Sequence, residues 1–570
     1  MKTLLHFFNF AICALARNLW HSNTTYYNPV LPGWHSDPSC TRVDDTFFCV
    51  TSTFIAFPGL PLYASKDLRD WKLISHVWNR ESQLPGVSWN STNQQDGMFA
   101  ATIRHHNGEF YVICEYLGIT GGIIGVLFKT TDPFDNAAWS DPVIFHPDKI
   151  DPDLFWDDDG TLYVATQGIV LQTLDMETGE LSQPAVSIWN GTGGVWPEGP
   201  HLYKKDGYYY LMIAEGGTAT NHSITIARAK NITGPYEAYN ANPILTNRGT
   251  QEYFQTVGHG DLFQDEAGSW WGMCLATRSG PAYEVYPMGR EAVLFPVTWE
   301  EDEWPVLQRV EGKMSAWPSM PAINRDIPGN GRSNSNPANS SIPNNLIHWR
   351  VPREGAFQIT DKGLQITPSR NNLTGIPYGP IELSGQRGLA FIGQRQTDTL
   401  FQYSVDLASK PRTANYEAGV TIFLTQVNHI DLGVVYLADS NSSNSTGQLY
   451  FRFRVESQNI PVAVPQENIV PVPAAWRNST LRLEISTQNN STYELSAMPA
   501  DSPEKALKVG TASAQLVSGG NGTFVGSLIG AYATCNGAGE GERCPGDDAA
   551  VFQRWRYEGL GQQIAEDEVV

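Results

Sequence analysis

The sequence predicts an all-β protein in which a five-bladed β-propeller is followed by a β-sandwich. Three observations support this prediction: a strand–turn–strand pattern that occurs five times, a polar linker after residue 320, and alternating apolar and polar stretches beyond it. The 570 residues are too many for one hydrophobic core, and 41 % apolar with 11 % aromatic residues is typical of globular domains. We expect a signal peptide at 1–16, the propeller at 20–320, a linker at 321–345 and the sandwich at 346–560.

Residues 1–16 have the features of a secretory signal peptide. Lys2 precedes an apolar run over residues 4–15, and residues 14–16 (Ala-Leu-Ala) form a small-x-small cleavage site. The run is too short to span a bilayer, which disfavours a membrane anchor. Acceptor sequences for N-glycosylation occur at Asn23, Asn90, Asn190, Asn221, Asn231, Asn372, Asn478 and Asn521. Together these features predict a glycosylated protein that is secreted and extracellular.

The first unit contains a repeated strand–turn–strand pattern. At five places a turn residue is followed by a run rich in aromatic and β-branched residues. The turn residues are Asp45, Gly108, Gly160, Gly207 and Gly268. They lie 47 to 63 residues apart, close to the length of a propeller blade with insertions. Five such blades close into a ring without exposed sheet edges, so the pattern predicts a five-bladed propeller.

The repeat also places one residue of each blade at an equivalent position. Nine residues before the turn, or eight in the first copy, stand Asp37, Phe99, Asp151, Glu198 and His259. Because the innermost strands of a propeller line its axis, we expect these side chains to surround one pocket. Taken singly, Asp-Pro and Pro-Glu-Gly segments are ordinary turn and capping sequences. That alternative does not explain why all three acids share one phase of the repeat.

A change in composition near residue 320 separates the two units. Residues 324–345 are rich in Asn, Ser, Pro and Gly, as expected of a linker. The stretches after it alternate between apolar and polar residues with period two, which predicts the strands of a sandwich. They lie at 364–367, 400–405, 420–424, 449–454, 481–485 and 551–555.

Six cysteines remain once Cys13 is removed with the signal peptide. Two pairs bracket a short turn or loop and predict local disulfides: Cys40–Cys49 and Cys535–Cys544. The blade count places Cys114 in the second blade and Cys274 in the fifth, which are not neighbours in a five-membered ring. We therefore expect these two to be buried free thiols.

The chain is acidic, with 38 Lys and Arg against 59 Asp and Glu and a net charge of −21. Such a protein repels phosphate backbones and anionic lipids, so we expect no nucleic-acid and no membrane partner. A neutral polysaccharide or oligosaccharide, bound by aromatic rings and carboxylates, fits the composition better. We expect the protein to be a monomer.

Carboxylates that converge in an aromatic pocket suit glycoside hydrolysis. One carboxylic acid protonates the leaving oxygen, while a carboxylate activates water or attacks the anomeric carbon. Glu198 follows residues 195–197 (Val-Trp-Pro), an apolar neighbourhood expected to raise its pKa, and is our candidate acid. Asp37 follows a His-Ser pair expected to hydrogen-bond it and is our candidate base. Asp151 would hold the acid protonated and orient it.

Five strings span residues 28–297: NPVLPGWHSDPSC, KIDPDLFWDDDG, WPEGPHLYKKDGYYYLMIAEGG, VGHGDLF and MGREAVLFPV. In combination they resemble glycoside hydrolase family 43, the inverting β-xylosidases, α-L-arabinofuranosidases and arabinanases. The resemblance implies a five-bladed propeller with Asp37 as base, Asp151 as pKa-modulating aspartate and Glu198 as acid. It also implies an arginine near the base, at Arg290. The C-terminal unit is similar to the concanavalin A-like sandwich of xylosidase-type members, in which a sandwich loop approaches the pocket mouth.

The resemblance also implies a role for His259, which in many members faces a calcium ion or a water molecule on the axis. A histidine in a local hydrogen-bond network is the alternative, and no cofactor is required for the chemistry itself. Trp89, Phe99 and Trp196 are candidate sugar platforms or else packing residues.

These observations predict a secreted, inverting exo-glycosidase that removes terminal pentoses from arabinoxylan or xylan. The motifs do not separate an α-L-arabinofuranosidase from a β-D-xylosidase. The rival class is a glycan-binding protein on an inactive hydrolase scaffold. The presence of Asp37, Asp151 and Glu198 argues against it, because a lectin does not need three mutually repelling acids.

Overall fold

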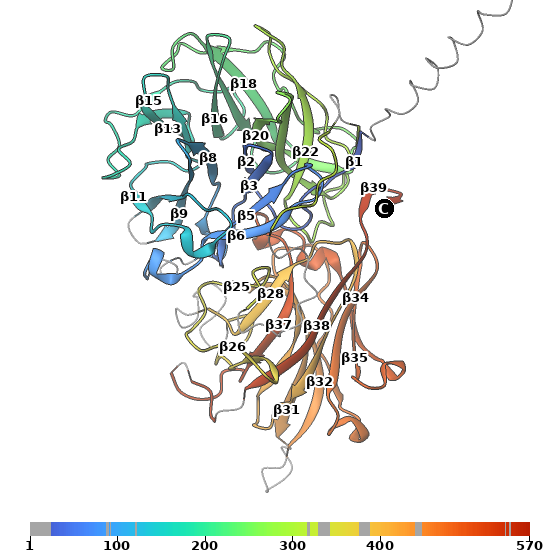
Figure 1. Cartoon of the computed structure of the whole chain (residues 1–570). Coiled ribbons are helices and arrows are strands. Elements are labelled where there is room, and N and C mark those ends of the chain that lie inside the picture. Colours follow the sequence, from blue (N-terminus) through green and yellow to red (C-terminus); the bar gives the residue numbers. More distant parts are fainter. Residues whose placement is uncertain are drawn as a thin grey trace, which may run out of the picture.

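The computed structural model describes residues 24–86, 91, 93–119, 122–315, 320–328, 342–375, 388–438, 447–541, 543–546 and 549–570. The predicted signal peptide, Asn23, Trp89 and Asn90 lie outside these residues. Two β-rich units are stacked end to end, with the propeller above and the sandwich below in Figure 1. Within the described ranges, no helix is long and apolar enough to cross a membrane.

The described part of the first unit forms a ring of five antiparallel sheets, which confirms the predicted propeller. Blade one contains β2 (Ser39–Val43), β3 (Thr46–Val50), β5 (Gly59–Ser65) and β6 (Lys72–Trp78). Blade two contains β7 (Gly97–Met98), β8 (Thr102–His106), β9 (Glu109–Ile119), β10 (Gly122–Thr130) and β11 (Val143–Phe145). Blade three contains β12 (Asp153–Trp156), β13 (Leu162–Thr166), β14 (Val170–Thr173) and β15 (Val186–Ser187). The predicted turns join β2 to β3, β8 to β9 and β12 to β13.

The last two blades follow the same order. Blade four contains β16 (Glu198–Lys205), β17 (Tyr208–Glu215), β18 (Ser223–Ala229) and β19 (Glu237–Ala238). Blade five contains β20 (Phe254–Gln264), β21 (Trp270–Arg278), β22 (Glu291–Thr298) and β23 (Val306–Leu307). Aromatic side chains fill the space between blades; for example, the rings of Tyr210 and Trp299 meet edge to face at 4.8 Å.

The segment before blade one closes the ring against blade five. β1 (Thr25–Tyr27) pairs antiparallel with β24 (Lys313–Ser315). The side chain of Asn28 accepts a hydrogen bond from the backbone N–H of Leu294 (2.9 Å) and donates to its carbonyl (3.0 Å). A short two-stranded sheet joins residues 286 to 290 positions apart, and the Asn28 side chain joins residues 266 positions apart.

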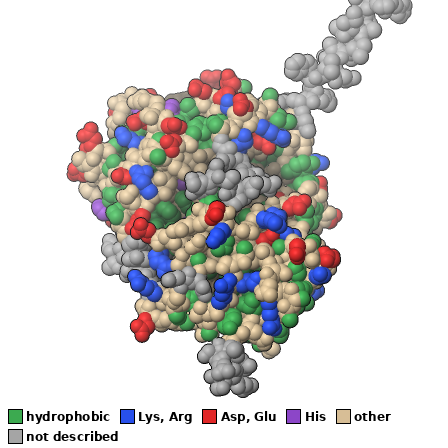
Figure 2. Space-filling model, turned by 60° about the horizontal axis from the view of Figure 1, so that its bottom comes forward, with side chains coloured by type: hydrophobic (Ala, Val, Ile, Leu, Met, Phe, Trp, Pro, Cys, Tyr) green, Lys and Arg blue, Asp and Glu red, His purple; other side chains and the backbone are tan. Residues whose placement is uncertain are grey.

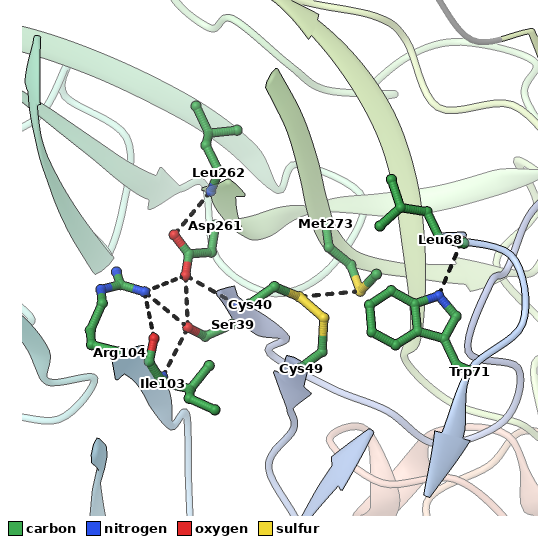
Figure 3. The surroundings of a disulfide bond; sticks show 10 residues. All are labelled: Ser39, Cys40, Cys49, Leu68, Trp71, Ile103, Arg104, Asp261, Leu262 and Met273. Carbon is green, nitrogen blue, oxygen red and sulfur yellow. Dashed lines mark hydrogen bonds and ion pairs between the residues drawn. A yellow bond between two sulfur atoms is a disulfide. The ribbon is translucent and has the colours of Figure 1, made fainter. Parts of the chain in front are cut away.

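Both predicted disulfides and both predicted free thiols are confirmed. Cys40 and Cys49 face each other across β2 and β3 and are bonded, with the Sγ of Cys40 3.7 Å from the Sδ of Met273 (Figure 3). The second pair is Cys535–Cys544. The other two described cysteines, Cys114 on β9 and Cys274 on β21, are buried free thiols.

In the described residues the second unit consists of two packed antiparallel sheets, which confirms the predicted sandwich. One sheet is ordered β33 (Asn468–Pro471), β32 (Gly447–Ser457), β31 (Asn428–Ala438), β30 (Glu417–Thr425), β37 (Leu528–Thr534), β28 (Phe391–Arg395), β25 (Ile347–Trp349) and β4 (Ala56–Phe57). The other is ordered β26 (Phe357–Thr360), β27 (Gly363–Ile366), β38 (Ala550–Gly561), β29 (Leu400–Ser409), β34 (Leu481–Asn489), β35 (Thr492–Pro499) and β36 (Leu507–Ser513). Every second side chain of β32 and β34 is buried, as the period-two pattern predicts.

The two units share a sheet. β4 comes from the propeller sequence but pairs with β25, so that Ala56 lies opposite Trp349 at the edge of the sandwich. Arg278 of β21 forms an ion pair with Glu291 (2.6 Å) and donates to the side-chain oxygen of Gln562 (2.6 Å). Figure 2 shows acidic side chains along the propeller end of one face of the molecule. The sequence predicts two units and a linker, but the pairing of β4 with β25 and the hydrogen bond from Arg278 to Gln562 make the junction part of both folds.

Candidate active site

The residues predicted to face the axis lie at the inner ends of the blades. Asp37 and Asp151 each stand two residues before the first strand of their blade, Glu198 begins β16, and His259 lies within β20. Asp37, Asp151 and His259 border one cavity of about 10 Å³ on the axis. Their φ angles are +53°, +59° and +49°, a conformation that non-glycine residues rarely adopt. Three of the five residues at the shared phase of the repeat therefore also share a backbone geometry.

Asp37 is buried among groups that favour its ionised form. Ser52 Oγ donates to Oδ2 (2.8 Å), Arg290 Nη1 donates to Oδ1 (3.0 Å), and His259 Nδ1 lies 3.7 Å from Oδ1. Burial by itself raises the pKa of Asp37, but Arg290, His259 and the Ser52 hydrogen bond outweigh it and hold the pKa below its usual value. Asp37 is therefore a carboxylate able to accept a proton.

The polar groups around Asp37 differ from those expected from the sequence. The ring of His35 pairs with the Tyr63 hydroxyl (2.7 Å), and Ser36 Oγ donates to the carbonyl of Phe524 (3.1 Å). The predicted His-Ser pair is thus used elsewhere. Ser52 and the predicted Arg290 bind the Asp37 carboxylate instead.

Glu198 is buried and carries a carboxyl group that is hard to ionise. Burial and the negative charge of Asp37 raise its pKa to about 7, although Gln167 Nε2 donates to Oε2 (3.2 Å) and opposes the shift. Burial is the largest cause of the shift, as predicted, but Val195 and Trp196 do not provide it, because they are 60 % and 66 % exposed. The Glu198 carboxyl group is buried because it lies near the axis of the propeller, and not because of the residues that precede it in the sequence.

Asp151 connects the other acids. Its Oδ2 accepts a hydrogen bond from the backbone N–H of Gly199, the residue after Glu198 (3.0 Å). Burial raises the pKa of Asp151, and the charges of Glu198, Glu115 and Asp37 raise it further. The Asp151 carboxyl group therefore favours its protonated form, and it is placed to fix the start of β16 through Gly199.

Glu115 is a member of this cluster that the sequence analysis missed. It is fully buried on β9, and its Oε1 accepts the backbone N–H of Asp151 (3.0 Å), while Oε2 has no hydrogen-bond partner among the described residues. Burial raises the pKa of Glu115 to about 8, with a further contribution from Asp37. An acidic residue ending the apolar run Phe-Tyr-Val-Ile-Cys was the available signal.

His259 lies beside the Asp37 carboxylate, with Nδ1 3.7 Å from Oδ1. Burial lowers its pKa to about 4, so the ring is neutral, and its nearest carboxylate is Asp37. Among the described residues, no group of three His, Cys, Asp or Glu side chains is arranged to hold a metal ion. We assign no step of the chemistry to a metal.

A second layer of charged residues lies two positions further along the inner strands. Arg104 donates to Asp153 Oδ1 (2.6 Å) and to Asp261 Oδ2 (2.7 Å), and Ser39 Oγ also donates to Asp261 (2.7 Å; Figure 3). Burial acts to raise the pKa of Asp261, but Arg104 and the hydrogen bonds lower it to about 2. A guanidinium thus compensates the carboxylates behind the catalytic layer.

One aromatic residue reaches the site from the sandwich. Phe524, just before β37, lies with its ring centroid 5.8 Å from that of Phe54 and 6.4 Å from that of Phe99. Its carbonyl accepts hydrogen bonds from Arg290 Nη2 (3.2 Å) and Ser36 Oγ (3.1 Å). The cation of Arg290 also lies 5.0 Å from the Phe524 ring. The C-terminal unit is therefore part of the site.

The candidate sugar platforms have different surroundings. Phe99 is half-buried and packs edge to face against Phe54 at 5.0 Å, so it has packing contacts at the site. Trp196 is largely exposed two residues before Glu198, which favours a platform over a packing residue. Trp89 lies outside the described residues.

Comparisons with known proteins agree with this geometry. The model of the glycosyl hydrolases family 43 matches residues 26–305, and that of the β-xylosidase C-terminal concanavalin A-like domain matches residues 339–558. The non-reducing end α-L-arabinofuranosidase BoGH43B of Bacteroides ovatus is 34 % identical over 536 residues, covering 91 % of this chain and 94 % of that protein. The xylosidase/arabinosidase 43B of Humicola insolens is 29 % identical, covering 89 % and 94 %. The crystal structure of the GH43 BlXynB protein from Bacillus licheniformis is similar with a TM-score of 0.77 at 27 % identity, covering 94 % of this chain and 100 % of that one.

Proposed function

The chain belongs to glycosyl hydrolase family 43 and is a glycoside hydrolase, and from this premise we propose that it is a secreted, inverting exo-glycosidase of xylan-type hemicellulose. It would remove terminal pentoses, α-L-arabinofuranosyl or β-D-xylosyl. The similar proteins of B. ovatus and H. insolens carry arabinofuranosidase and xylosidase names, which supports both sugars.

The observation that carries this proposal is the contrast between two buried carboxyl groups. The pKa of Asp37 is held low by Arg290, and the pKa of Glu198 is raised to about 7. Near neutral pH one is ionised while the other retains much of its proton. This is the pairing of base and acid that glycoside hydrolysis requires.

In the proposed reaction a water molecule is the nucleophile. Asp37 removes a proton from this water as its oxygen bonds to the anomeric carbon. The bond from that carbon to the leaving oxygen breaks as Glu198 transfers its proton to the leaving oxygen. Because attack and departure take place on opposite faces of the sugar, the configuration at the anomeric carbon inverts. Inversion requires a carboxyl separation of roughly 6.5–9.5 Å, enough for the water.

Asp151 acts as a positioning residue in this proposal. Its hydrogen bond from Gly199 orients the backbone that carries Glu198. The Asp151 backbone is in turn held by Glu115.

Aromatic residues around the acids support an exo-acting site. Phe524 of the sandwich packs with Phe54 and Phe99 beside Arg290, and these rings would limit how far a chain extends beyond the terminal sugar. The exposed Trp196, two residues before Glu198, offers an apolar face on which the leaving group would stack.

Secretion is supported by the two disulfides and by exposed glycosylation sequences. Asn190, Asn221, Asn231 and Asn478 are exposed, whereas Asn372 is buried and is a poor acceptor in the folded chain. We propose that the mature protein acts as an extracellular monomer.

Release of free pentose from arabinoxylan and xylan tests the activity and separates it from the glycan-binding alternative. We expect L-arabinose or D-xylose, with no larger early product. Proton NMR in the first minutes should show the anomer opposite to that of the substrate. Retained configuration would overturn the role of Asp37 as base, and bound but uncleaved polysaccharide would overturn the hydrolase proposal.

A further inference from the structure

A much larger cavity lies at the junction of the two units, apart from the catalytic centre. Its volume is about 520 Å³, within the range of small-molecule sites, and its walls come from blade one and from the sandwich. The cavity opens at the surface beside Arg325, whose side chain is 71 % exposed. Residues 30–32 and His35 form one wall, so the segment that leads to Asp37 separates the cavity from the axis.

Arg395 is the most unusual group in this wall. It is buried, and its Nε donates to the carbonyl of Trp34 (2.7 Å), but Nη2 has no hydrogen-bond partner among the described residues. The described structure also gives its guanidinium no carboxylate partner, and burial lowers its pKa. An unpaired buried cation is costly, so this position favours a bound anion.

The other charges of the cavity act in the same direction. Arg69, Lys72 and Arg325 add three cations, against the carboxylates of Asp70 and Asp398. Asp70 is already paired with Arg325 (2.6 Å). Asp398 accepts hydrogen bonds from the side chains of Thr397 and Gln562, at 2.7 Å each. The cavity therefore has a local excess of positive charge in a protein whose net charge is −21.

Aromatic rings supply the remaining surface. Trp71 and Trp555 are half-buried, and their indole N–H groups already donate, to the Leu68 carbonyl (3.1 Å; Figure 3) and to Gln394 Oε1 (3.1 Å). Their polar atoms are thus satisfied within the protein, and the rings offer apolar faces to the cavity. Cations beside apolar rings suit a ligand that combines sugar rings with a carboxylate.

We propose that this cavity is an accessory binding site for a xylo-oligosaccharide that carries a uronic acid side group. The carboxylate would pair with Arg395 and Lys72, and the sugar rings would stack on Trp555 and Trp71. The choice of a xylan backbone rests on the proposed function, whereas the need for a carboxylate rests on the charges of the cavity alone. An acidic xylan could thereby be held by the enzyme at a second point while its terminal pentose is removed.

Calorimetry on the full chain carrying Glu198→Gln tests this proposal, with excess L-arabinose and D-xylose present to occupy the catalytic pocket. The probes are a glucuronosyl xylotriose, neutral xylotetraose and digalacturonate. We expect the acidic xylo-oligosaccharide to bind about tenfold more tightly than the neutral one, since only the acidic probe can form a charged hydrogen bond with Arg395. Equal affinity for the first two probes, or a preference for digalacturonate, would overturn the assignment.

Two substitutions locate the site. Arg395→Gln should remove the preference for the acidic probe, and Trp555→Ala should weaken both xylan probes; the second keeps the test valid if the first variant does not fold. Trp304→Ala, at a half-buried tryptophan of the propeller stacked at 4.7 Å on Tyr239, is the matched control and should change neither affinity. Unchanged binding in Arg395→Gln and Trp555→Ala would overturn the site. Hydrolysis of a small aryl pentoside, measured separately in Trp555→Ala, should be unchanged and reports on the proposed function independently.

Discussion

Two successive layers of buried carboxylates on the propeller axis differ in how their charge is compensated. In the layer behind the pocket, Asp153 and Asp261 share the guanidinium of Arg104, and the pKa of Asp261 falls to about 2. In the pocket layer, Arg290 donates a hydrogen bond to one carboxylate of the described residues, that of Asp37 (3.0 Å). The pKa of Glu198 there rises to about 7.

Burial is common to both layers, so burial alone does not make a carboxyl group a proton donor. The difference is the number and position of the cations. A fully paired layer is structural, whereas an under-compensated layer retains a proton near neutral pH. The residues of the two layers lie only two positions apart along the same strands, Asp151 before Asp153 and His259 before Asp261. The following predictions test this distinction, from the largest expected effect to the smallest.

Asp37→Ala should have the largest effect, because water activation is needed whichever group leaves. We expect kcat/KM to fall by about 10²–10⁴-fold or more on both arabinoxylan and an aryl pentoside. Steady-state kinetics on the two substrates would measure it, with circular dichroism as the control for folding. A loss confined to one substrate would contradict the role of Asp37 as base.

Glu198→Ala should discriminate between substrates. Natural linkages should lose about 10²–10⁴-fold, while an aryl pentoside with an acidic phenol should retain appreciable activity because its phenolate leaves without a proton. The alkaline limb of the pH–rate profile, expected near pH 7, should disappear.

Gln167→Ala is the matched variant, since it removes the hydrogen bond to Glu198 and keeps the carboxyl group. That hydrogen bond lowers the pKa of Glu198, so the limb should move to higher pH with activity retained. Equal losses on both substrates in Glu198→Ala, with the limb intact, would show that the acid lies elsewhere, with Asp151 the first candidate.

Arg104→Leu should mainly affect stability. It leaves Asp153 and Asp261 buried without their cation, which is expected to cost about 3–5 kcal/mol of unfolding free energy. Urea denaturation would measure this loss. Arg309→Leu, which breaks the exposed pair with Glu252, should cost no more than about 1 kcal/mol. Similar costs for the two variants would refute the proposed role of the second layer.

Glu115→Gln should act on the pH dependence of stability and not on catalysis. The folded pKa of Glu115 is raised to about 8, whereas an unfolded glutamate titrates near 4.3. Between these values the folded state binds the extra proton, so the unfolding free energy falls as pH rises. The variant lacks this contribution and should gain stability relative to the natural chain between pH 5 and pH 8.

Denaturation midpoints at the two pH values would measure this gain. Glu109→Gln, a partly exposed position on the same strand, should show no such gain. A constant difference between the natural chain and Glu115→Gln at both pH values would indicate that Glu115 does not hold the extra proton.

The propeller and its axial acids could be predicted because their signal is local and repeated. A turn residue and the position nine residues before it lie within one strand and its hairpin, so the phase of the repeat places Asp151, Glu198 and His259 without tertiary information. The local disulfides follow from the same short-range logic, since Cys40 and Cys49 face each other across one hairpin.

The environment of each acid could not be predicted in the same way. Trp196, which was expected to keep water away from Glu198, is exposed. His35 and Ser36, which were expected to bind Asp37, bind Tyr63 and Phe524 instead. The residues that contact these acids come from other blades. Arg290, next to β22 of blade five, binds Asp37, and Glu115, on β9 of blade two, binds the backbone of Asp151. A pKa depends on these distant neighbours, so the sequence identifies an acid more readily than its protonation state.

The sequence by itself determined the two β units, the five blades, the cysteine pairing and the ring of acids, because hydrophobic period and turn chemistry act over a few residues. Only the tertiary structure decided that β4 completes the sandwich sheet, that Phe524 contacts Ser36, which lies 488 residues earlier beside Asp37, and that Arg395 lines a cavity between the units. These contacts join surfaces that are complementary only after each unit has folded, and no local pattern in the chain records which surfaces will meet.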